Sequence, residues 1–137
     1  MDEKEHVLSK NESFYNAFNK QNLEEMMNVW FEDSSAMCIH PGWPVLRGYQ
    51  PIVDSWKDIF DHNDHMEIRL SNVFVTVSGN LAWVSCQENL FSMNMSGVQT
   101  SKVHASNLFR QVNGHWKMQL HHAAALPPTG PEEAMNN

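Results

Sequence analysis

The spacing of apolar residues changes near Met66, and this change most limits the folds that the chain can form. Before Met66, apolar side chains recur every three to four residues, which is typical of amphipathic helices. After it, apolar and polar residues alternate, which is typical of strands that bury one face. Helices followed by a run of strands predict an α+β domain with a mostly antiparallel sheet.

Three helices are predicted before the change. The first covers about residues 2–20, and the second follows Asn22, which can cap a helix and is followed three positions later by Glu25. Pro51 can open the third helix, because proline is favoured in a first turn. A short apolar strand is predicted at 36–40, before a Pro-Gly turn.

Four long strands are predicted after the change. They cover residues 66–78, 81–92, 99–112 and 115–124. The segments between them, Gly79-Asn80, MNMSG and Asn113-Gly114, are suitable hairpin turns. We expect one domain at 1–125 and a loose tail at 126–137, where prolines are frequent and no periodicity is present.

Charge and composition exclude several partners. The chain has 9 Lys and Arg against 16 Asp and Glu, a net charge of −7, so no positive field attracts nucleic acid or an anionic membrane. The first twenty residues lack the basic start and apolar run of a signal peptide, and no apolar segment is long enough to span a bilayer. We expect a cytoplasmic protein in which Cys38 and Cys86 are reduced and buried.

Several segments in this order resemble a known family. AFNKQNLEEMMNVW covers two helices, AMCIHPG a strand and its turn, LRGYQPIVDSWKDIF the third helix, and NLFRQVNGHWKMQLHHA the last hairpin. They are similar to the SnoaL-like branch of the nuclear transport factor 2-like superfamily, which includes ketosteroid isomerases. The resemblance covers about residues 5–124. It implies a cystatin-like cone, in which three helices pack on a curved sheet, with a pocket at the open end and a homodimer formed through the outer sheet face.

The resemblance also implies positions for site residues. Ketosteroid isomerases use a carboxylate base, and a tyrosine and a protonated aspartate that donate hydrogen bonds to the forming enolate. Alignment places His40 at the base, Phe14 at the tyrosine and Asn107 at the aspartate. Because the phenolic donor is replaced by a benzene ring, isomerisation by the family's mechanism is not expected.

Alternation along the strands adds further candidates. Asn107 and Phe109 share an apolar face, so we expect both to point inside. On the last strand, His122 shares a face with Trp116, whereas His121 lies on the other face. We therefore expect only one of these two histidines to face the cavity and take His122 as the ligand-binding candidate.

Three other side chains are candidates for the pocket wall. Glu88 is one, since a carboxylate on an inner face needs a proton or a cationic partner, such as His122 or Arg110. Trp43 follows the Pro-Gly turn, where it either lines the pocket or covers its mouth. Trp56 lies on the apolar stripe of the third helix, where core packing is the alternative.

Three functions remain open at this point. The first is the binding of a mainly apolar small molecule, oriented by His40 and Asn107. The second is a lyase, isomerase or hydrolase acting on a carbonyl compound, with His40 as general base and Asn107 as polariser. The third is an oligomerisation module.

Two further alternatives concern His40. Its ring could simply bond a loop carbonyl and brace the Pro-Gly turn. No cofactor and no metal are expected, because no compact ligand set is visible, but a long-range set of His40, Glu88 and His122 stays an alternative.

Overall fold

Helices come first and a sheet follows. The computed structural model describes residues 2–62 and 66–128. The elements are α1 (Glu3–Lys20), α2 (Leu23–Val29), β1 (Met37–Ile39), β2 (Leu46–Arg47), α3 (Tyr49–His62), β3 (Met66–Ser78), β4 (Leu81–Asn94), β5 (Gly97–Val112) and β6 (His115–Ala125). The predicted α+β class is confirmed, and so are all of the predicted elements. The two-residue strand β2 was not predicted, because a pair of residues carries no periodic signal.

The helices begin where side chains can satisfy their first N–H groups. Asn22 caps α2 by accepting a hydrogen bond from the Glu25 N–H at 3.0 Å, as predicted. The third helix begins at Tyr49, two residues before the predicted start at Pro51. Proline is tolerated there because an N–H in the first turn has no partner within the helix. The effect is to carry the inner face of α3 over the turn that follows β1.

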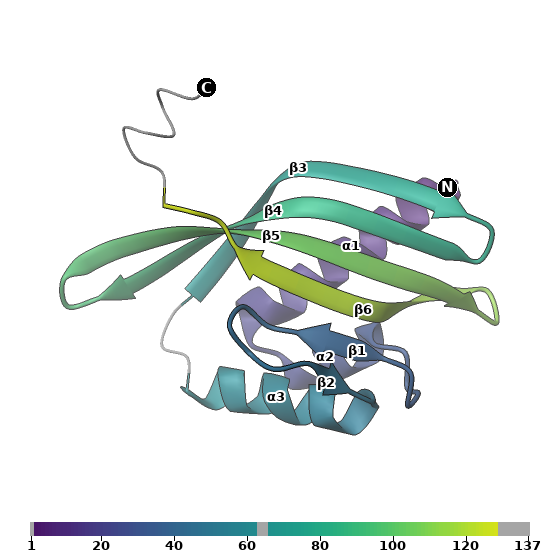
Figure 1. Ribbon diagram of the computed structural model, residues 1–137, viewed down its shortest axis with the longest axis horizontal. Helices are drawn as coiled ribbons and strands as arrows, with labels where there is room; N and C mark the ends of the chain where they lie inside the picture. Colours follow the sequence, from purple (N-terminus) through teal and green to yellow (C-terminus); the bar gives the residue numbers. More distant parts are fainter. Residues whose placement is uncertain (1, 63–65, 129–137) are drawn as a thin grey trace.

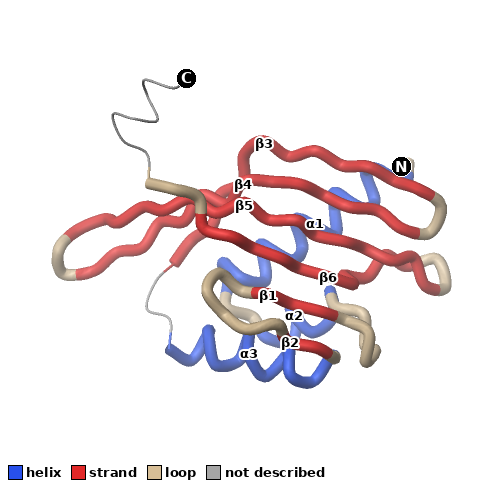
Figure 2. Tube along the Cα trace, in the orientation of Figure 1, coloured by secondary structure: helices blue, strands red, loops and turns tan. Residues whose placement is uncertain are grey.

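The six strands form one sheet in the order β2-β1-β6-β5-β4-β3. Only β1 and β6 pair in parallel; the other neighbours are antiparallel. The helices lie on one side of this sheet, and the β4–β5 hairpin extends beyond them (Figures 1 and 2). The strands therefore curve around the helices and leave an open end beside α3.

Irregular positions in two strands break the predicted alternation. In β3, the register shifts between Ser71 and Phe74, and Asn72 has a φ of 51°. In β6, Leu120 pairs with Leu108 and Met118 pairs with Phe109, so Gln119 is an extra residue. Such bulges bend a strand and increase its twist.

The bulge at Gln119 corrects the predicted faces of β6. Trp116 and Met118 point into the core, as expected, but the extra residue reverses the alternation beyond it. His121 is buried at 3% exposure, whereas His122 is exposed. The expectation that one of the two histidines faces inward holds, but the choice of His122 is wrong.

The core lies between the helices and the concave face of the sheet. It includes Phe14, Trp30, Val84, Phe109 and Met118, each at most 2% exposed. Both cysteines are buried free thiols, as predicted. This core closes the cone below its open end.

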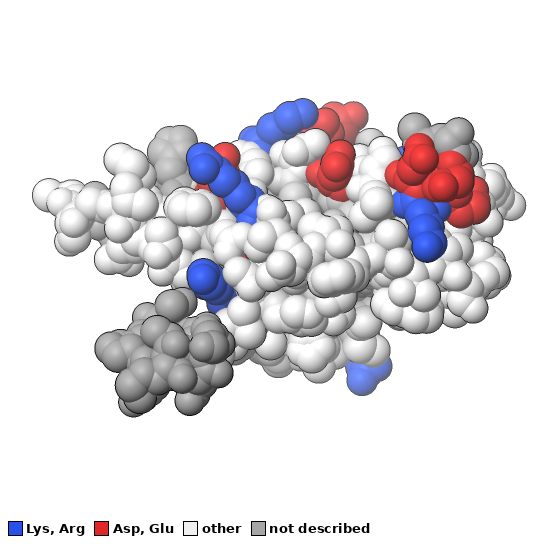
Figure 3. Space-filling view, turned by 90° about the horizontal axis from the view of Figure 1, so that it is seen from above, with Lys and Arg blue, Asp and Glu red and all other residues white. Residues whose placement is uncertain are grey.

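The outer surface carries charge unevenly. On the face seen in Figure 3, most of the surface is uncharged, and acidic side chains gather toward the end where α1 begins. No helix in the described part of the chain is long and apolar enough to cross a membrane. Of the tail predicted at 126–137, residues 129–137 lie outside the described residues.

Candidate functional site

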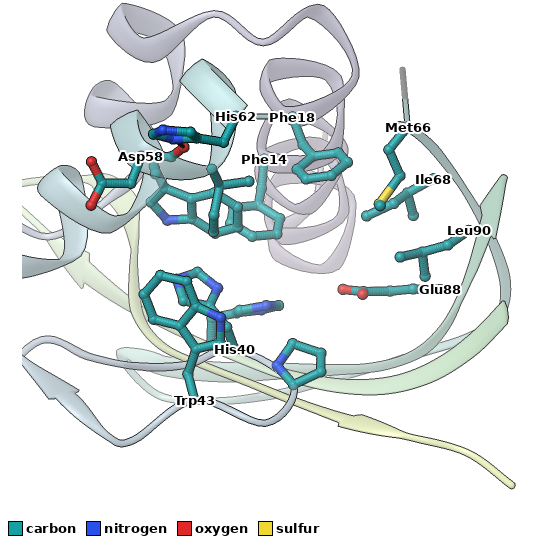
Figure 4. Close-up of a pocket in the computed structure, with 14 residues that line it drawn as sticks. Phe14, Phe18, His40, Trp43, Asp58, His62, Met66, Ile68, Glu88 and Leu90 are labelled. Atoms are coloured by element: carbon teal, nitrogen blue, oxygen red, sulfur yellow. Dashed lines mark hydrogen bonds between the residues drawn. The ribbon is translucent and has the colours of Figure 1, made fainter. Parts of the chain in front are cut away.

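A cavity of about 490 Å³ occupies the open end of the cone. It lies between α1, α3, the turn after β1 and the inner face of the sheet (Figure 4). Its walls are formed by Phe14, Phe18, His40, Pro41, Trp43, Trp56, Asp58, Ile59, His62, Met66, Ile68, Glu88, Leu90 and His121. The structure therefore brings five of the predicted site residues, from positions 14 to 88, to one cavity.

Aromatic rings form one side of the cavity. Trp56 packs edge-on against Phe14, with ring centroids 5.4 Å apart, and against His40 at 4.6 Å. His40 also meets Trp43 at 4.8 Å. Trp56 is buried at 4% exposure, while Trp43 is 40% exposed at the rim. Both alternatives for Trp43 are thus realised, since it lines the cavity and covers part of its mouth.

Glu88 points into the cavity from β4 (Figure 4) and is 4% exposed. Its Oε2 atom accepts a 2.6 Å hydrogen bond from the Tyr15 hydroxyl. Burial raises the pKa of the Glu88 carboxyl from 4.5 to about 7, and the bond from Tyr15 opposes part of this rise. The predicted partners, His122 and Arg110, do not bond Glu88 in the structure.

Tyr15 is one residue of the hydrogen-bond network behind the cavity that sequence reasoning missed. Alignment placed Phe14 at the tyrosine of the relatives, and Phe14 does line the cavity, but the next residue supplies a phenol. Burial, and then the charge of Glu88, raise the pKa of Tyr15, so its hydroxyl keeps its proton. The only indication in the sequence was that Tyr15, whose ring carries a hydroxyl, lies among the apolar residues of the first helix.

Asn107 is fully buried, as predicted, but it lies behind the cavity wall. Its Nδ2 donates to Asn11 Oδ1 at 2.8 Å and to the Tyr15 hydroxyl at 3.1 Å. Its Oδ1 accepts from His121 Nδ1 at 2.6 Å. Asn107 therefore positions Tyr15 and His121 rather than facing a ligand. Phe109, the other candidate on this strand, is 0% exposed and packs in the core away from the cavity.

The bond to Asn107 fixes the tautomer of His121. An amide oxygen can only accept, so Nδ1 of His121 carries the proton and Nε2 is a bare acceptor. Burial is the main reason that the pKa of His121 falls to about 3, so its ring is neutral. Because His121 lines the cavity, it offers a hydrogen-bond acceptor there.

A second pair of bonds fixes the tautomer of His40. The Ser55 hydroxyl donates to the Ile52 carbonyl at 2.6 Å, so its oxygen accepts from His40 Nε2 at 2.9 Å. His40 Nδ1 is then unprotonated, and the Cys38 sulfur lies 3.9 Å from it. Burial lowers the pKa of His40 to about 4. The ring does not bond a loop carbonyl, so the bracing role considered for it is wrong in that form.

A long-range metal site was the remaining alternative. The described residues contain no group of three His, Cys, Asp or Glu side chains placed to hold an ion. The long-range set of His40, Glu88 and His122 is not assembled, because His122 points to the other face of the sheet.

Comparison with known proteins places this geometry in a family. Residues 7–128 match the model of the SnoaL-like domain. A proposed dehydratase of the NTF2-like family from Streptomyces avermitilis is 30% identical and has a TM-score of 0.84, with 91% of this chain and 96% of that one covered.

Two further proteins are similar to this chain. A proposed association domain of calcium/calmodulin-dependent protein kinase type II from Thiobacillus denitrificans is 26% identical, with a TM-score of 0.80 and coverage of 88% of this chain and 94% of that one. The F-box protein SKIP8 of Arabidopsis thaliana is 24% identical over 120 residues, which are 88% of this chain. The match spans 49%, or about half, of that relative's length.

Proposed function

The chain belongs to the SnoaL-like domain family, and we propose that it binds a small, mainly apolar molecule in the cavity at the open end of its cone. The cavity carries this proposal. Its volume of about 490 Å³ lies in the range of small-molecule sites, and such sites combine apolar walls with a few convergent polar groups. Here the polar groups are Glu88, His40 and His121, which arrive from three separate parts of the chain.

Filling the cavity tests this proposal. Leu90 lines it from β4, and Leu90→Trp places an indole inside. Compounds with a phenylbutyl body are suitable probes, because they are apolar and small enough to fit within the cavity. We expect saturable binding of at least one such probe to the wild-type protein and at least tenfold weaker binding to Leu90→Trp.

The matched control adds the same ring outside the cavity. Leu81 begins the same strand and is 36% exposed, so Leu81→Trp leaves the cavity unchanged. Binding should survive in this variant. Binding that is equally strong in Leu90→Trp would place the ligand elsewhere and refute the proposal.

A second candidate function is proton transfer on a bound carbonyl or hydroxyl compound, of the dehydratase or isomerase type. Glu88, with a pKa of about 7, can give or take a proton near neutrality, while His40 is an unprotonated base beside the same cavity. In a dehydration, the base removes a C–H proton as the C–O bond breaks, and the acid protonates the departing hydroxide to give water and an alkene. The 30% identical proposed dehydratase adds support by analogy.

Exchange of carbon-bound protons tests the second candidate. We expect the protein to speed deuterium exchange next to the carbonyl of 4-phenylbutan-2-one, followed by NMR in heavy water. His40→Ala should lower that rate at least tenfold, whereas His115→Ala, at an exposed histidine, should leave it unchanged. No acceleration over buffer, or equal rates in both variants, would exclude His40 as the base.

Self-association is a separate proposal. Phe74 and Trp83 lie on the outer face of β3 and β4 at 69% and 43% exposure, and exposed aromatic rings of this kind favour an interface. We expect a homodimer that Trp83→Lys converts to a monomer in light scattering. A closed ring larger than a dimer would instead favour an oligomerisation module like the proposed association domain of the relative.

A further inference from the structure

We propose that the ligand of this cavity carries a protonated amine on an apolar body, and that the ammonium group is held by Glu88 and His121 as hydrogen-bond acceptors. The inference rests on the proposed function, since it requires that the cavity bind a small molecule. It adds the chemical class of that molecule.

The hydrogen-bond acceptors left free in the cavity wall indicate this chemical class of ligand. Tyr15 donates to Glu88 Oε2, which leaves Oε1 without a partner among the described residues. Asn107 Oδ1 accepts a hydrogen bond from the Nδ1–H group of His121, so the nitrogen left for a ligand, Nε2, can only accept. At the rim, the backbone carbonyl of Asp58 accepts a hydrogen bond from the Nδ1–H group of His62 in the same way. These bonds occupy the donors of Tyr15, His121 and His62 and leave acceptors of Glu88 and His121 for a ligand.

Donors for a ligand oxygen are scarce in the same walls. No lysine or arginine is among the described residues that line the cavity. The indole nitrogen of Trp56 is buried with no partner in the described structure, and Trp43 lies at the rim. A carbonyl ligand thus finds a donor deep in the cavity only when Glu88 itself is protonated.

Charge and ring contacts favour a cation further. Glu88 points into the cavity across from Phe14 and Phe18 (Figure 4), and Trp56 belongs to the same aromatic wall. Asp58 adds a second acidic residue among those that line the cavity. Aromatic faces attract ammonium groups, and the attraction is stronger where water is excluded. An ammonium group can donate three hydrogen bonds and pair with the buried carboxylate.

Whether binding affinity rises or falls with pH distinguishes an ammonium ligand from a carbonyl ligand. The titratable groups around Glu88 are Tyr15, Cys38, Cys86, His40 and His121, with Asp58 and His62 at the rim. Tyr15 and the two thiols keep their protons because burial raises their pKa values, and the pKa values of the two buried histidines lie well below 6. Glu88 alone among the groups inside therefore titrates near neutrality. An ammonium ligand needs Glu88 ionised and binds more tightly as pH rises, whereas a carbonyl ligand needs it protonated and binds less tightly.

The experiment uses four compounds with one body: 4-phenylbutylamine, 4-phenylbutan-1-ol, 4-phenylbutan-2-one and 4-phenylbutyrate. Calorimetric titrations are made at pH 6, 7 and 8, where the amine stays protonated. We expect the amine to bind at least tenfold more tightly than the alcohol at pH 8. Its affinity should rise about tenfold from pH 6 to pH 8, following the ionised fraction of Glu88.

Three variants test whether the effect arises at Glu88. Glu88→Gln keeps an acceptor for Tyr15 but removes the charge, so the preference for the amine and its pH dependence should both disappear. Glu67→Gln removes an exposed carboxylate from the neighbouring strand and should change neither. Tyr15→Phe removes the hydrogen bond that lowers the Glu88 pKa, so the midpoint of the pH dependence should move upward, which a merely structural role would not produce.

The outcomes separate this inference from the proposed function. If the alcohol or ketone binds as tightly as the amine, or if the ketone's affinity falls as pH rises while the amine shows no preference, the amine inference is wrong and cavity binding stands. If the acid binds most tightly, the inference is also overturned. If none of the four binds at millimolar concentration, the proposed function itself is refuted.

Discussion

Replacing Glu88 by glutamine should stabilise the folded protein at high pH more than at low pH. The folded state holds the Glu88 carboxyl among apolar side chains, where burial raises its pKa from 4.5 to about 7. The folded protein therefore keeps a proton on Glu88 that the unfolded chain releases. The favourable contribution is complete below pH 4.5 and is lost as pH rises through 7.

The magnitude follows from the two pKa values. One pKa unit corresponds to about 1.4 kcal/mol, so ionising Glu88 costs the folded state about 3 kcal/mol in full, and between pH 5 and pH 8 about 2.5 kcal/mol of this is expressed. Glutamine has the same shape and does not ionise. The free energy of unfolding of Glu88→Gln, minus that of the wild type, should thus increase by about 2.5 kcal/mol from pH 5 to pH 8.

Urea denaturation of both proteins at pH 5, 6, 7 and 8 measures this difference. A comparison of variants is needed because His40 and His121 act in the opposite direction: their lowered pKa values cost stability as pH falls below 6.5. Those effects are common to both proteins and cancel in the difference. A flat difference over this range would falsify the reasoning, since burial would then not raise the pKa of the Glu88 carboxyl.

Two further substitutions test the bonds that set the tautomers. Asn107→Ala leaves Tyr15 without a donor and His121 Nδ1 without an acceptor, so urea titration should show a loss of about 2 to 4 kcal/mol in unfolding free energy. Ser55→Ala removes the acceptor for His40 Nε2, and we expect a loss of about 1 kcal/mol together with a change of the His40 tautomer in nitrogen-15 NMR spectra. An unchanged tautomer would show that Ser55 does not set it.

Much of the fold could be predicted because its signals are local. The capping residue Asn22, the period of the helical stripes and the Gly-containing turns each act over a few residues, and each was found where predicted. Five candidate side chains also line the cavity, among them His40, Glu88 and Trp56. Glu88 and Trp56 were found from strand and helix faces, which repeat regularly over short distances. His40 and Phe14 were found from the family resemblance, and Trp43 from its place after the Pro-Gly turn.

The hydrogen-bond network could not be predicted in the same way. Tyr15 meets Glu88 across 73 positions of sequence, and Asn107 meets Asn11 across 96. Such pairs depend on how α1 lies across β4 and β5, and no local pattern contains that information. The same holds for Ser55, because no pattern in the sequence marks it as the hydrogen-bond partner of His40.

The error at His122 has a local physical cause that can be tested by deletion. Gln119 is the extra residue of the bulge in β6, and no glycine marks the position. With the bulge present, deleting Gln119 restores strict alternation and still leaves Met118 and His121 pointing inward. Were β6 regular, the same deletion would exchange the two faces of the strand beyond Met118 and bury His121 in place of His122.

The bulged and the regular arrangement of β6 predict different effects of deleting Gln119 on the stability of the protein. In the observed arrangement, the deletion removes the hydrogen bonds from Gln119 Nε2 to the Ser35 carbonyl, at 2.8 Å, and to its hydroxyl, at 3.2 Å. We expect the free energy of unfolding to fall by about 1 to 3 kcal/mol, and the hydrogen bond from His121 Nδ1 to Asn107 to remain visible by NMR. Loss of cooperative unfolding in the deletion variant would mean that the inward residues had changed face. His121 faces the cavity because the extra residue Gln119 precedes it in β6. The same experiment therefore tests whether one inserted residue places the His121 acceptor in the binding site.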